Sequence, residues 1–409
     1  MYLPMSRWKV LSLCTALSAA TLSAPALADF SIPGFELVHS LPVATDLKAL
    51  DIRDPATVWC EMIDGAHSTI DLEQFYATSM PGTALDKVIA RLEAAGARGV
   101  HIRFLMEKRG ERMSDAPTLD RLRRIPNLEF RELAYSDVSG DGIIHAKFFV
   151  VDSRSAFVGS QNFDWRALEQ IDETGLKIDQ PTMVAQLTEI FVHDWKAQAL
   201  IGAGKTVPRH KNAFTAVQLD GPATLLASPA ADDPDDVVDS EQALVSLIGQ
   251  ARYNVRVTVM DYAPLGQHRQ YYDLIDRALR AAAQRGIKVQ LLVSNWNLTT
   301  DKLPYLKSLA VLPNIEIRVV TIPQAPSGFI PYARVIHTKA MTIDDRIAWV
   351  GTSNWEGGYL DNSRNVEIVL RNAAMAEKLN ALHQQLWLSP YADPLTVDAP
   401  RPLPHPDQP

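Results

Sequence analysis

The pattern of hydrophobic and polar positions in the first half of the chain predicts a strand, a helix and a second strand. Residues 66–77, "AHSTIDLEQFYA", alternate in the manner of a half-buried strand. Residues 83–99, "TALDKVIARLEAAGARG", have the period of an amphipathic helix, and residues 100–106, "VHIRFLM", form the next apolar run. This order is typical of one α/β unit.

The second half repeats the same order. A strand is expected in 251–263, "ARYNVRVTVMDYA", a helix in 271–286, "YYDLIDRALRAAAQRG", and a strand in 287–296, "IKVQLLVSNW". Gly99 and Gly286 follow the two helices at the same place, where a left-handed C-cap needs no side chain. The chain therefore reads as two unequal copies of one α/β unit.

Each copy then reaches the same polar motif. Residues 143–162 read "IIHAKFFVVDSRSAFVGSQN", and 192 residues later 335–354 read "VIHTKAMTIDDRIAWVGTSN". If these segments are strands, each His and the Lys two positions on share one face. A turn at each aspartate should fold the chain back as a hairpin, bringing a glycine and an asparagine beside the pair. The repeated residues are His145, Lys147, Asp152, Gly159 and Asn162, then His337, Lys339, Asp344, Gly351 and Asn354.

Two histidines, two lysines and two asparagines suit an anion better than a metal, because the set holds no thiolate or carboxylate cluster. Lysines and amides can hold a phosphate and stabilise charge as phosphorus becomes five-coordinate. One neutral imidazole can attack phosphorus while the other, protonated, donates to the leaving alcohol. The alternative is that each His-x-Lys pair is only the polar face of a surface hairpin, and its exact duplication argues against that. The other eight histidines, His39 among them, lack this context and are interpreted as structural or solvated.

Composition divides the chain into segments. Residues 1–28 carry Arg7 and Lys9, then an apolar run and Ala26-Leu27-Ala28, as in a secretory signal peptide cleaved before Asp29. We expect an N-terminal domain in 29–205, a linker and edge segment in 206–242 that includes a hairpin, a C-terminal domain in 243–392, and a proline-rich tail in 393–409 that does not pack. The segment "ALIGAGKT" resembles a phosphate-binding loop, but it follows a helical run and precedes Val207-Pro208, so we interpret it as a helix C-terminus.

Removal of the leader changes the formal net charge from −8 to −10 and leaves one cysteine, Cys60. A single cysteine forms no internal disulfide, although export would take the chain to an oxidising compartment, periplasmic or extracellular. The negative charge opposes broad binding to nucleic acid or anionic lipid, while a local basic pocket remains compatible with it.

The two motifs resemble the signature of the phospholipase D superfamily, His-x-Lys-x(4)-Asp followed by Gly and Asn, twice per chain. The surroundings, among them "GSQNFDWRALEQIDETG" and "IPYARVIHTKAM" leading into "GTSNWEGGY", resemble the branch of lysosomal single-strand exonucleases and poxviral envelope phospholipase-like proteins. The resemblance implies two α/β sandwich domains about a pseudo-twofold axis with one active site at their interface. It also implies a ping-pong reaction through a phosphohistidine, without metal or other cofactor.

Carried over residue by residue, the resemblance makes His145 the nucleophile and His337 the acid and then the base. Lys147, Lys339, Asn162 and Asn354 would hold the phosphate. Asp152 and Asp344 complete the catalytic signature, and we expect them to brace the hairpins. Glu173 and Glu367 would orient the histidines through their second ring nitrogens. Trp165 and Trp355 are expected to pack beside the asparagines.

Three hypotheses for function follow. The first is an exported phosphodiesterase that hydrolyses or transfers the phosphatidyl group of phospholipids at a membrane surface. The second is a nuclease for single-stranded DNA or RNA, which the similarity to the exonuclease branch favours and the net charge opposes. The third is an inactive envelope scaffold, against which the intact His-Lys pairs argue.

Overall fold

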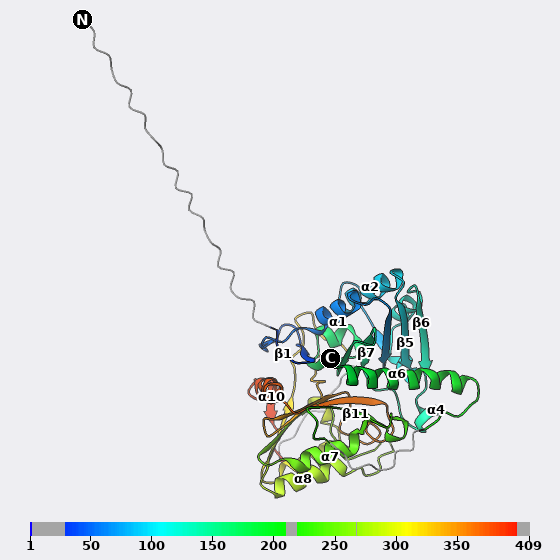
Figure 1. Ribbon diagram of the computed structural model, residues 1–409. Coiled ribbons are helices and arrows are strands. Elements are labelled where there is room, and N and C mark those ends of the chain that lie inside the picture. The colour runs from blue at the N-terminus through cyan, green and yellow to red at the C-terminus, as the bar shows by residue number, and fades with distance from the viewer. Residues whose placement is uncertain (2–28, 210–218, 267, 399–409) are drawn as a thin grey trace.

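The computed structural model describes Met1 and residues 29–209, 219–266 and 268–398, and shows two similar halves packed on each other (Figure 1). The remainder of the expected leader, residues 2–28, lies outside the described residues, as does 399–409 of the expected tail. Each half is built on one mixed sheet, so the α/β class expected from the repeated pattern is the observed one.

The two sheets have the same strand order. The N-terminal sheet runs β1 (Ser31–Ile32), β2 (Phe35–Ser40), β10 (Glu173–Ile178), β8 (Ser155–Gly159), β7 (Phe148–Val151), β3 (Thr69–Gln74), β5 (His101–Glu107), β6 (Leu128–Leu133). The C-terminal sheet runs β12 (Val238–Asp239), β11 (Ala223–Ser228), β18 (Asn365–Leu370), β17 (Ile347–Gly351), β16 (Ala340–Ile343), β13 (Asn254–Val259), β14 (Lys288–Ser294), β15 (Ile315–Val320), β19 (Ala392–Pro394). From β2 to β6 and from β11 to β15 the orders match strand for strand. A separate small ladder pairs β4 (Ala77–Thr78) with β9 (Phe163–Asp164).

Helices cover both faces of each sheet, and one helical layer is shared. The two longest helices, α6 (Pro181–Gly202) and α10 (Ala373–Trp387), contribute to a core that also takes side chains from both sheets. The outer faces are covered by α1 (Pro55–Asp64), α2 (Ala84–Ala97) and α3 (Ala116–Arg123) in one half and by α7 (Ser240–Gln250), α8 (Leu274–Gln284) and α9 (Leu303–Ala310) in the other. Short helices complete the chain: η1 (Lys108–Met113), α4 (Ser136–Ser139), α5 (Trp165–Glu169), η2 (Ala230–Asp232) and η3 (Asn295–Asn297). The halves thus share a buried core and are not independent globules.

The periodicity located the repeated elements correctly. The expected strand, helix and strand of each half are β3, α2 and β5, then β13, α8 and β14. Gly99 and Gly286 follow their helices at φ of +92° and +85°, the left-handed conformation that disfavours a side chain. α6 ends at Gly202, so the interpretation of "ALIGAGKT" as a helix C-terminus is confirmed.

Two expectations concern the domain edges. The second strand of the expected hairpin is β11, which pairs antiparallel with β18 and parallel with the short β12 and so belongs to the C-terminal sheet, while residues 215–218 of the first strand lie outside the described residues. The expectation that the tail does not pack is wrong for residues 393–395, because β19 pairs with β15 and Leu395 is buried in the core. In both places a short segment next to prolines pairs as a strand with a distant strand of the sheet. Local composition does not reveal such long-range contacts.

Candidate active site

The two His-x-Lys segments lie where the halves meet. We expected them to be part of the strands, but they come just before β7 and β16. They stay outside the regular strands because each pairs across the interface. The backbone N–H of His145 donates to the carbonyl of Arg364 (2.9 Å), and that of His337 donates to the carbonyl of Asp172 (2.8 Å). Each half therefore holds the motif of the other.

Both imidazoles are buried and bound through Nδ1 by the opposite half. His337 Nδ1 lies 2.8 Å from Glu173 Oε2, and His145 Nδ1 lies 3.1 Å from Asn365 Oδ1. Each contact leaves Nε2 for a reacting group, with Nδ1–H donating to the partner oxygen. One histidine therefore has a carboxylate partner and the other a neutral amide, an asymmetry in a site that is otherwise nearly twofold.

The expectation that Glu367 orients a histidine is wrong. The carboxylate of Glu367 is buried and accepts hydrogen bonds from the hydroxyls of Ser240 and Ser353. Burial raises its pKa to about 8. The strand register explains the difference, since Glu367 pairs with Gly351 as Gly175 pairs with Gly159. The equivalent of Glu173 is Asn365, and the sequence held the signal: each follows its motif histidine by 28 residues.

The two lysines lie buried and close enough to repel each other. Each Nζ donates to the carbonyl of its own motif histidine. The distance from Lys339 Nζ to the His337 carbonyl is 2.7 Å, and Lys147 Nζ donates to the His145 carbonyl in the same way. Burial lowers the pKa of Lys339 to about 7, against the opposing attraction of Glu173. Burial and then the charge of Lys339 hold the pKa of Lys147 well below its ordinary range. Two closely placed buried ammonium groups are stabilised by a bound anion.

The asparagines supply unsatisfied polar groups. Asn162 and Asn354 are buried, yet Oδ1 of the first and both amide atoms of the second have no hydrogen-bond partner among the described residues. An unpaired buried polar atom costs roughly 1–3 kcal/mol, so a native site that keeps several is built for a ligand. An amide N–H could donate to a phosphate oxygen beside the lysines.

Asp152 and Asp344 lie at the opposite ends of β7 and β16 from the histidines, so their inclusion among the catalytic residues is wrong. Their carboxylates accept from backbone N–H groups of residues 67–69 and 252–254. Both turns have two consecutive positive-φ residues, Asp152-Ser153 and Asp344-Asp345, which suit tight hairpins. These aspartates brace the hairpins, which is the role expected for them from the sequence.

Burial controls the charge of both histidines. It lowers the pKa of His145 and His337 well below the ordinary value, and the two lysines lower each pKa further. Burial raises the pKa of Glu173 well above its ordinary value, against the opposing charge of Lys339. At 2.8 Å its carboxylate still favours the protonated form of His337, whereas His145 has only an amide. A bound phosphate anion would raise both pKa values, and His337 is the better placed to take the proton.

Several residues at the site were missed by sequence reasoning. The rings of Phe75 and Tyr359 lie 5.6 and 4.7 Å from the ring of His145. In the C-terminal half Lys302 forms ion pairs with Asp261 (3.1 Å) and Glu356 (2.6 Å). Burial raises the pKa of Tyr359, and the charges of Glu356 and Asp261 raise it further; Asp261 also opposes the lowering of the Lys339 pKa. We call this pair of carboxylates the acidic wall of the site. Glu356 and Tyr359 lie in the "GTSNWEGGY" segment after the second motif, but Phe75, Asp261 and Lys302 come from other loops, so no spacing along the chain groups these residues.

Trp355 is buried in the outer core of the C-terminal half, and Trp165 is partly buried against the outer core of the N-terminal half, so both pack as expected. Among the described positions, no three or more His, Cys, Asp or Glu side chains are grouped so as to hold a metal ion. In the same part of the chain, no helix combines the length and the apolar character needed to cross a bilayer.

The lysine pKa values predict how anion affinity depends on pH. Sulfate keeps its charge from pH 6 to 9, so any change in its inhibition reports the protein. We expect inhibition to weaken by roughly tenfold per pH unit above about pH 7, because Lys339 loses its proton there. The measurement is the inhibition constant against a chromogenic phosphodiester at constant ionic strength, with chloride as the control anion. A constant affinity across this range would contradict the assignment.

Comparisons with known proteins agree with this geometry. A family model described as "Cardiolipin synthase, PLD-like domain" matches residues 59–195 and 244–387. The chain is 31% identical over 389 residues to "Phospholipase D Z" of Dictyostelium discoideum, covering 88% of this chain and 91% of that protein. It is 30% identical over 401 residues to "5'-3' exonuclease PLD3" of Rattus norvegicus, covering 89% and 81%.

Among solved structures, a phosphatidylserine synthase of Haemophilus influenzae superposes with a TM-score of 0.59 at 11% identity, over 83% of this chain and 85% of that one. At that identity the likeness concerns the fold alone, and it confirms the expected pair of α/β domains.

Proposed function

The chain belongs to the phospholipase D superfamily of phosphodiester hydrolases, and from this premise we propose that it hydrolyses or transfers the phosphatidyl group of phospholipids. The reaction would proceed through a covalent phosphohistidine. The observation that carries the choice of substrate is the acidic wall: Asp261 acts on the buried Lys339, and Glu356 shares the Lys302 cation with Asp261.

The unequal histidine partners support a division of roles. His145, with a neutral amide on Nδ1, stays neutral and attacks phosphorus through the lone pair of Nε2. The bond from phosphorus to the leaving alcohol breaks, and that oxygen takes the Nε2 proton of His337, whose imidazolium Glu173 stabilises. His337 then removes a proton from water or an alcohol, whose oxygen displaces His145 from phosphorus. Lys147 and Lys339 would stabilise the charge on the equatorial oxygens in both steps.

Above about pH 7 the acidic wall has two carboxylates against the one ammonium of Lys302, and its remaining negative charge favours a substrate with one phosphate. A nucleic-acid strand carries a negative charge about every 3.4 Å along its axis, so a neighbouring phosphate would approach Asp261 and Glu356. A phospholipid such as phosphatidylcholine or phosphatidylethanolamine presents an ammonium group there instead, which the carboxylates attract. The histidines are 4% and 7% exposed, so only a small group can reach them. A lipid head group meets that condition.

A nuclease remains the second candidate, for one observation: the relative named "5'-3' exonuclease PLD3" matches 89% of this chain at 30% identity. The terminal phosphodiester of a single strand is also small enough to enter a closed site. The third hypothesis, an inactive scaffold, is set aside because the chain is a member of an enzyme family and retains both His-Lys pairs.

In the deciding experiment the purified protein is incubated with labelled phosphatidylcholine and ethanol. In a separate assay it is incubated with a single-stranded oligonucleotide that has a 5'-hydroxyl end, and both assays are run with and without chelator. Choline release with phosphatidylethanol as a product supports the proposal. Stepwise shortening of the oligonucleotide without lipid turnover would replace it with the nuclease.

The acidic wall gives a prediction about selectivity. Burial raises the pKa of Glu356 to about 7, so at pH 8 Glu356→Gln removes one negative charge while it keeps the shape of the side chain. We expect it to raise kcat/KM on an oligonucleotide by roughly 3- to 10-fold and to lower it on phosphatidylcholine, because local charge governs the approach of charged ligands. The matched control is Glu316→Gln, an exposed carboxylate on β15. Equal shifts on both substrates would show that the wall does not select charge.

We also propose that the protein is exported, which rests on the leader-like residues 1–28. Expression of the full chain in a bacterium should give a mature protein whose N-terminal residue is Asp29, detected by N-terminal sequencing of the periplasmic and culture fractions. An intact Met1 on protein retained in the cytoplasm would contradict export.

A further inference from the structure

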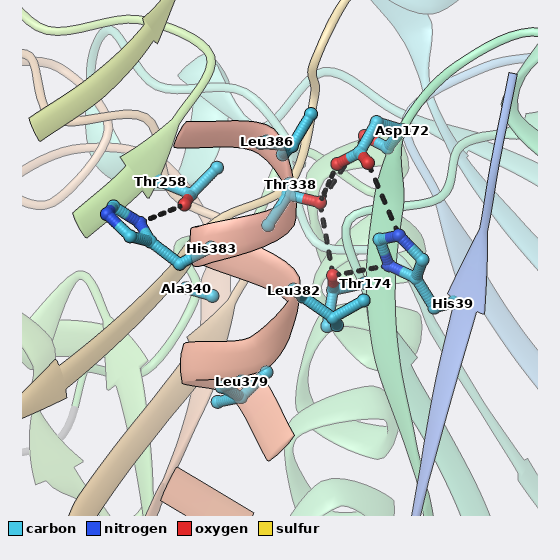
Figure 2. A pocket seen from close by; sticks show the side chains of 10 residues that line it. All are labelled: His39, Asp172, Thr174, Thr258, Thr338, Ala340, Leu379, Leu382, His383 and Leu386. Atoms are coloured by element: carbon cyan, nitrogen blue, oxygen red, sulfur yellow. Dashed lines mark hydrogen bonds and ion pairs between the residues drawn. The ribbon is translucent and has the colours of Figure 1, made fainter. Parts of the chain in front are cut away.

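A second buried polar cluster lies directly behind the Glu173–His337 pair. A small pocket lies between the halves, lined by β2 and β10 on one side and by α10 and the start of β16 on the other (Figure 2). Four polar side chains meet there: His39, Asp172 and Thr174 from the N-terminal half and Thr338 from the C-terminal half. All four are buried, and none was assigned a role by the sequence.

These side chains form a closed ring of contacts (Figure 2). His39 Nε2 lies 3.3 Å from Asp172 Oδ2, and His39 Nδ1 lies 3.0 Å from Thr174 Oγ1. Thr174 Oγ1 lies 3.1 Å from Thr338 Oγ1. Thr338 Oγ1 donates to Asp172 Oδ1 at 2.8 Å and is farther, 3.4 Å, from the Asp172 carbonyl. The ring thus spans the interface of the two halves.

Counting protons shows what state the ring requires. Each of the four contacts joins two atoms with lone pairs, so each needs one proton between them. The hydroxyls of Thr174 and Thr338 supply one each, and the remaining two must come from His39 and Asp172 together. If His39 is neutral and Asp172 is ionised, the two side chains together supply only one proton. One of the four contacts in the ring would then bring two lone pairs together with no proton between them. All four contacts are satisfied only when His39 and Asp172 together hold two protons, which makes this pair neutral overall.

The ring is joined to the active site through the backbone. Asp172 and Thr174 flank Glu173, and Thr338 follows His337, so in extended chain the ring lies on one side and the Glu173–His337 contact on the other. The Asp172 carbonyl also accepts from the backbone N–H groups of His337 and Thr338. Any movement in the ring therefore changes the distance between the Glu173 carboxylate and the His337 imidazole.

We propose that His39 is a positioning residue for this active site. Through its proton-sharing pair with Asp172, it closes the ring that fixes residues 172–174 against 337–338 and so aligns Glu173 with His337. His39 does not touch substrate. The proposal rests on the phosphodiesterase activity of the family and is independent of which phosphodiester is the natural substrate.

The test is a double-substitution cycle based on the proton count. Glutamine at position 39 can donate to Asp172 and accept from Thr174, which leaves the contact between the threonines without a proton. Asn at position 172 donates where Asp accepts, and it restores four protons for four contacts whether residue 39 is Gln or a neutral His. We therefore expect His39→Gln to lower kcat by about 10- to 100-fold with little change in KM, because small misplacement of a reacting group has effects of this size. Asp172→Asn and the double variant should stay within about threefold of the wild type.

The assay uses a chromogenic phosphodiester, so its outcome is separate from the choice between lipid and nucleic acid. Thermal unfolding of each variant checks that it folds. His383→Gln is the matched control, since His383 lines the same pocket and bonds Thr258 but not the ring; it should keep normal kcat. Restoration of kcat in the double variant supports the proposal. A double variant as slow as His39→Gln or slower, or a folded His39→Gln with unchanged kcat, would overturn it.

Discussion

His145→Ala and His337→Ala are each expected to lower kcat by about 10⁴-fold or more, because His145 is needed to form the covalent intermediate and His337 to break it down, so that either loss stops turnover. The two variants should differ in what they accumulate. Without His337 the second step lacks its base, so label from a phosphorus-labelled diester should remain on His145. Without His145 no labelled protein should form. Acid-free denaturation and peptide mapping by mass spectrometry would locate the phosphohistidine.

A matched control is His101→Ala, since His101 is exposed at the start of β5 and distant in the sheet from the motif. It should retain wild-type kcat. Label found on His337 in the His145→Ala variant would reverse the roles, and Glu173 would then stabilise the cationic phosphohistidine instead of the acid. Equal activity of all three variants would remove the mechanism.

Arg364→Leu is expected to lower the free energy of unfolding by about 3–5 kcal/mol, because it leaves two carboxylates buried without their cation. The guanidinium is fully buried and uses all five donors: it binds the carboxylates of Asp194 (2.6 and 3.1 Å) and Asp233 and the carbonyls of Ser228 and Asp232. It holds the pKa of Asp194 at about 2. Asp194 lies on α6 and Arg364 just before β18, so the cluster joins the two halves.

Urea unfolding followed by fluorescence measures the change. The control is Arg123→Leu, whose ion pair with Glu132 is about two-fifths exposed on the arginine side and is expected to contribute less than about 1 kcal/mol. A loss below about 1 kcal/mol for Arg364→Leu would contradict the assigned role. Because the Arg364 carbonyl also receives the N–H of His145, the variant should lose activity even where it remains folded.

The sequence by itself determined the elements, the duplication and the reacting groups. Apolar spacing depends on neighbours within one helix or strand, so α2, β5, α8 and β14 could be located from it. The motif histidines and lysines carried the chemistry in their residue types, and their exact repetition implied a shared site. The hairpin turns at Asp152 and Asp344 were also local, since side chain and backbone conformation decide them together.

The tertiary structure alone decided the partners of those groups. Asn365 and Glu367 lie on the same face of β18, so the choice between them depends on how far along β17 the strand is paired, and a shift of two residues would exchange them. Three features join segments that are more than 90 residues apart or in different halves. They are the contact of Glu173 with His337, the acidic wall of Asp261 and Glu356, and the ring around His39. Such contacts arise only when the two sheets pack through a common core, because no spacing within one segment encodes which distant surface it will meet.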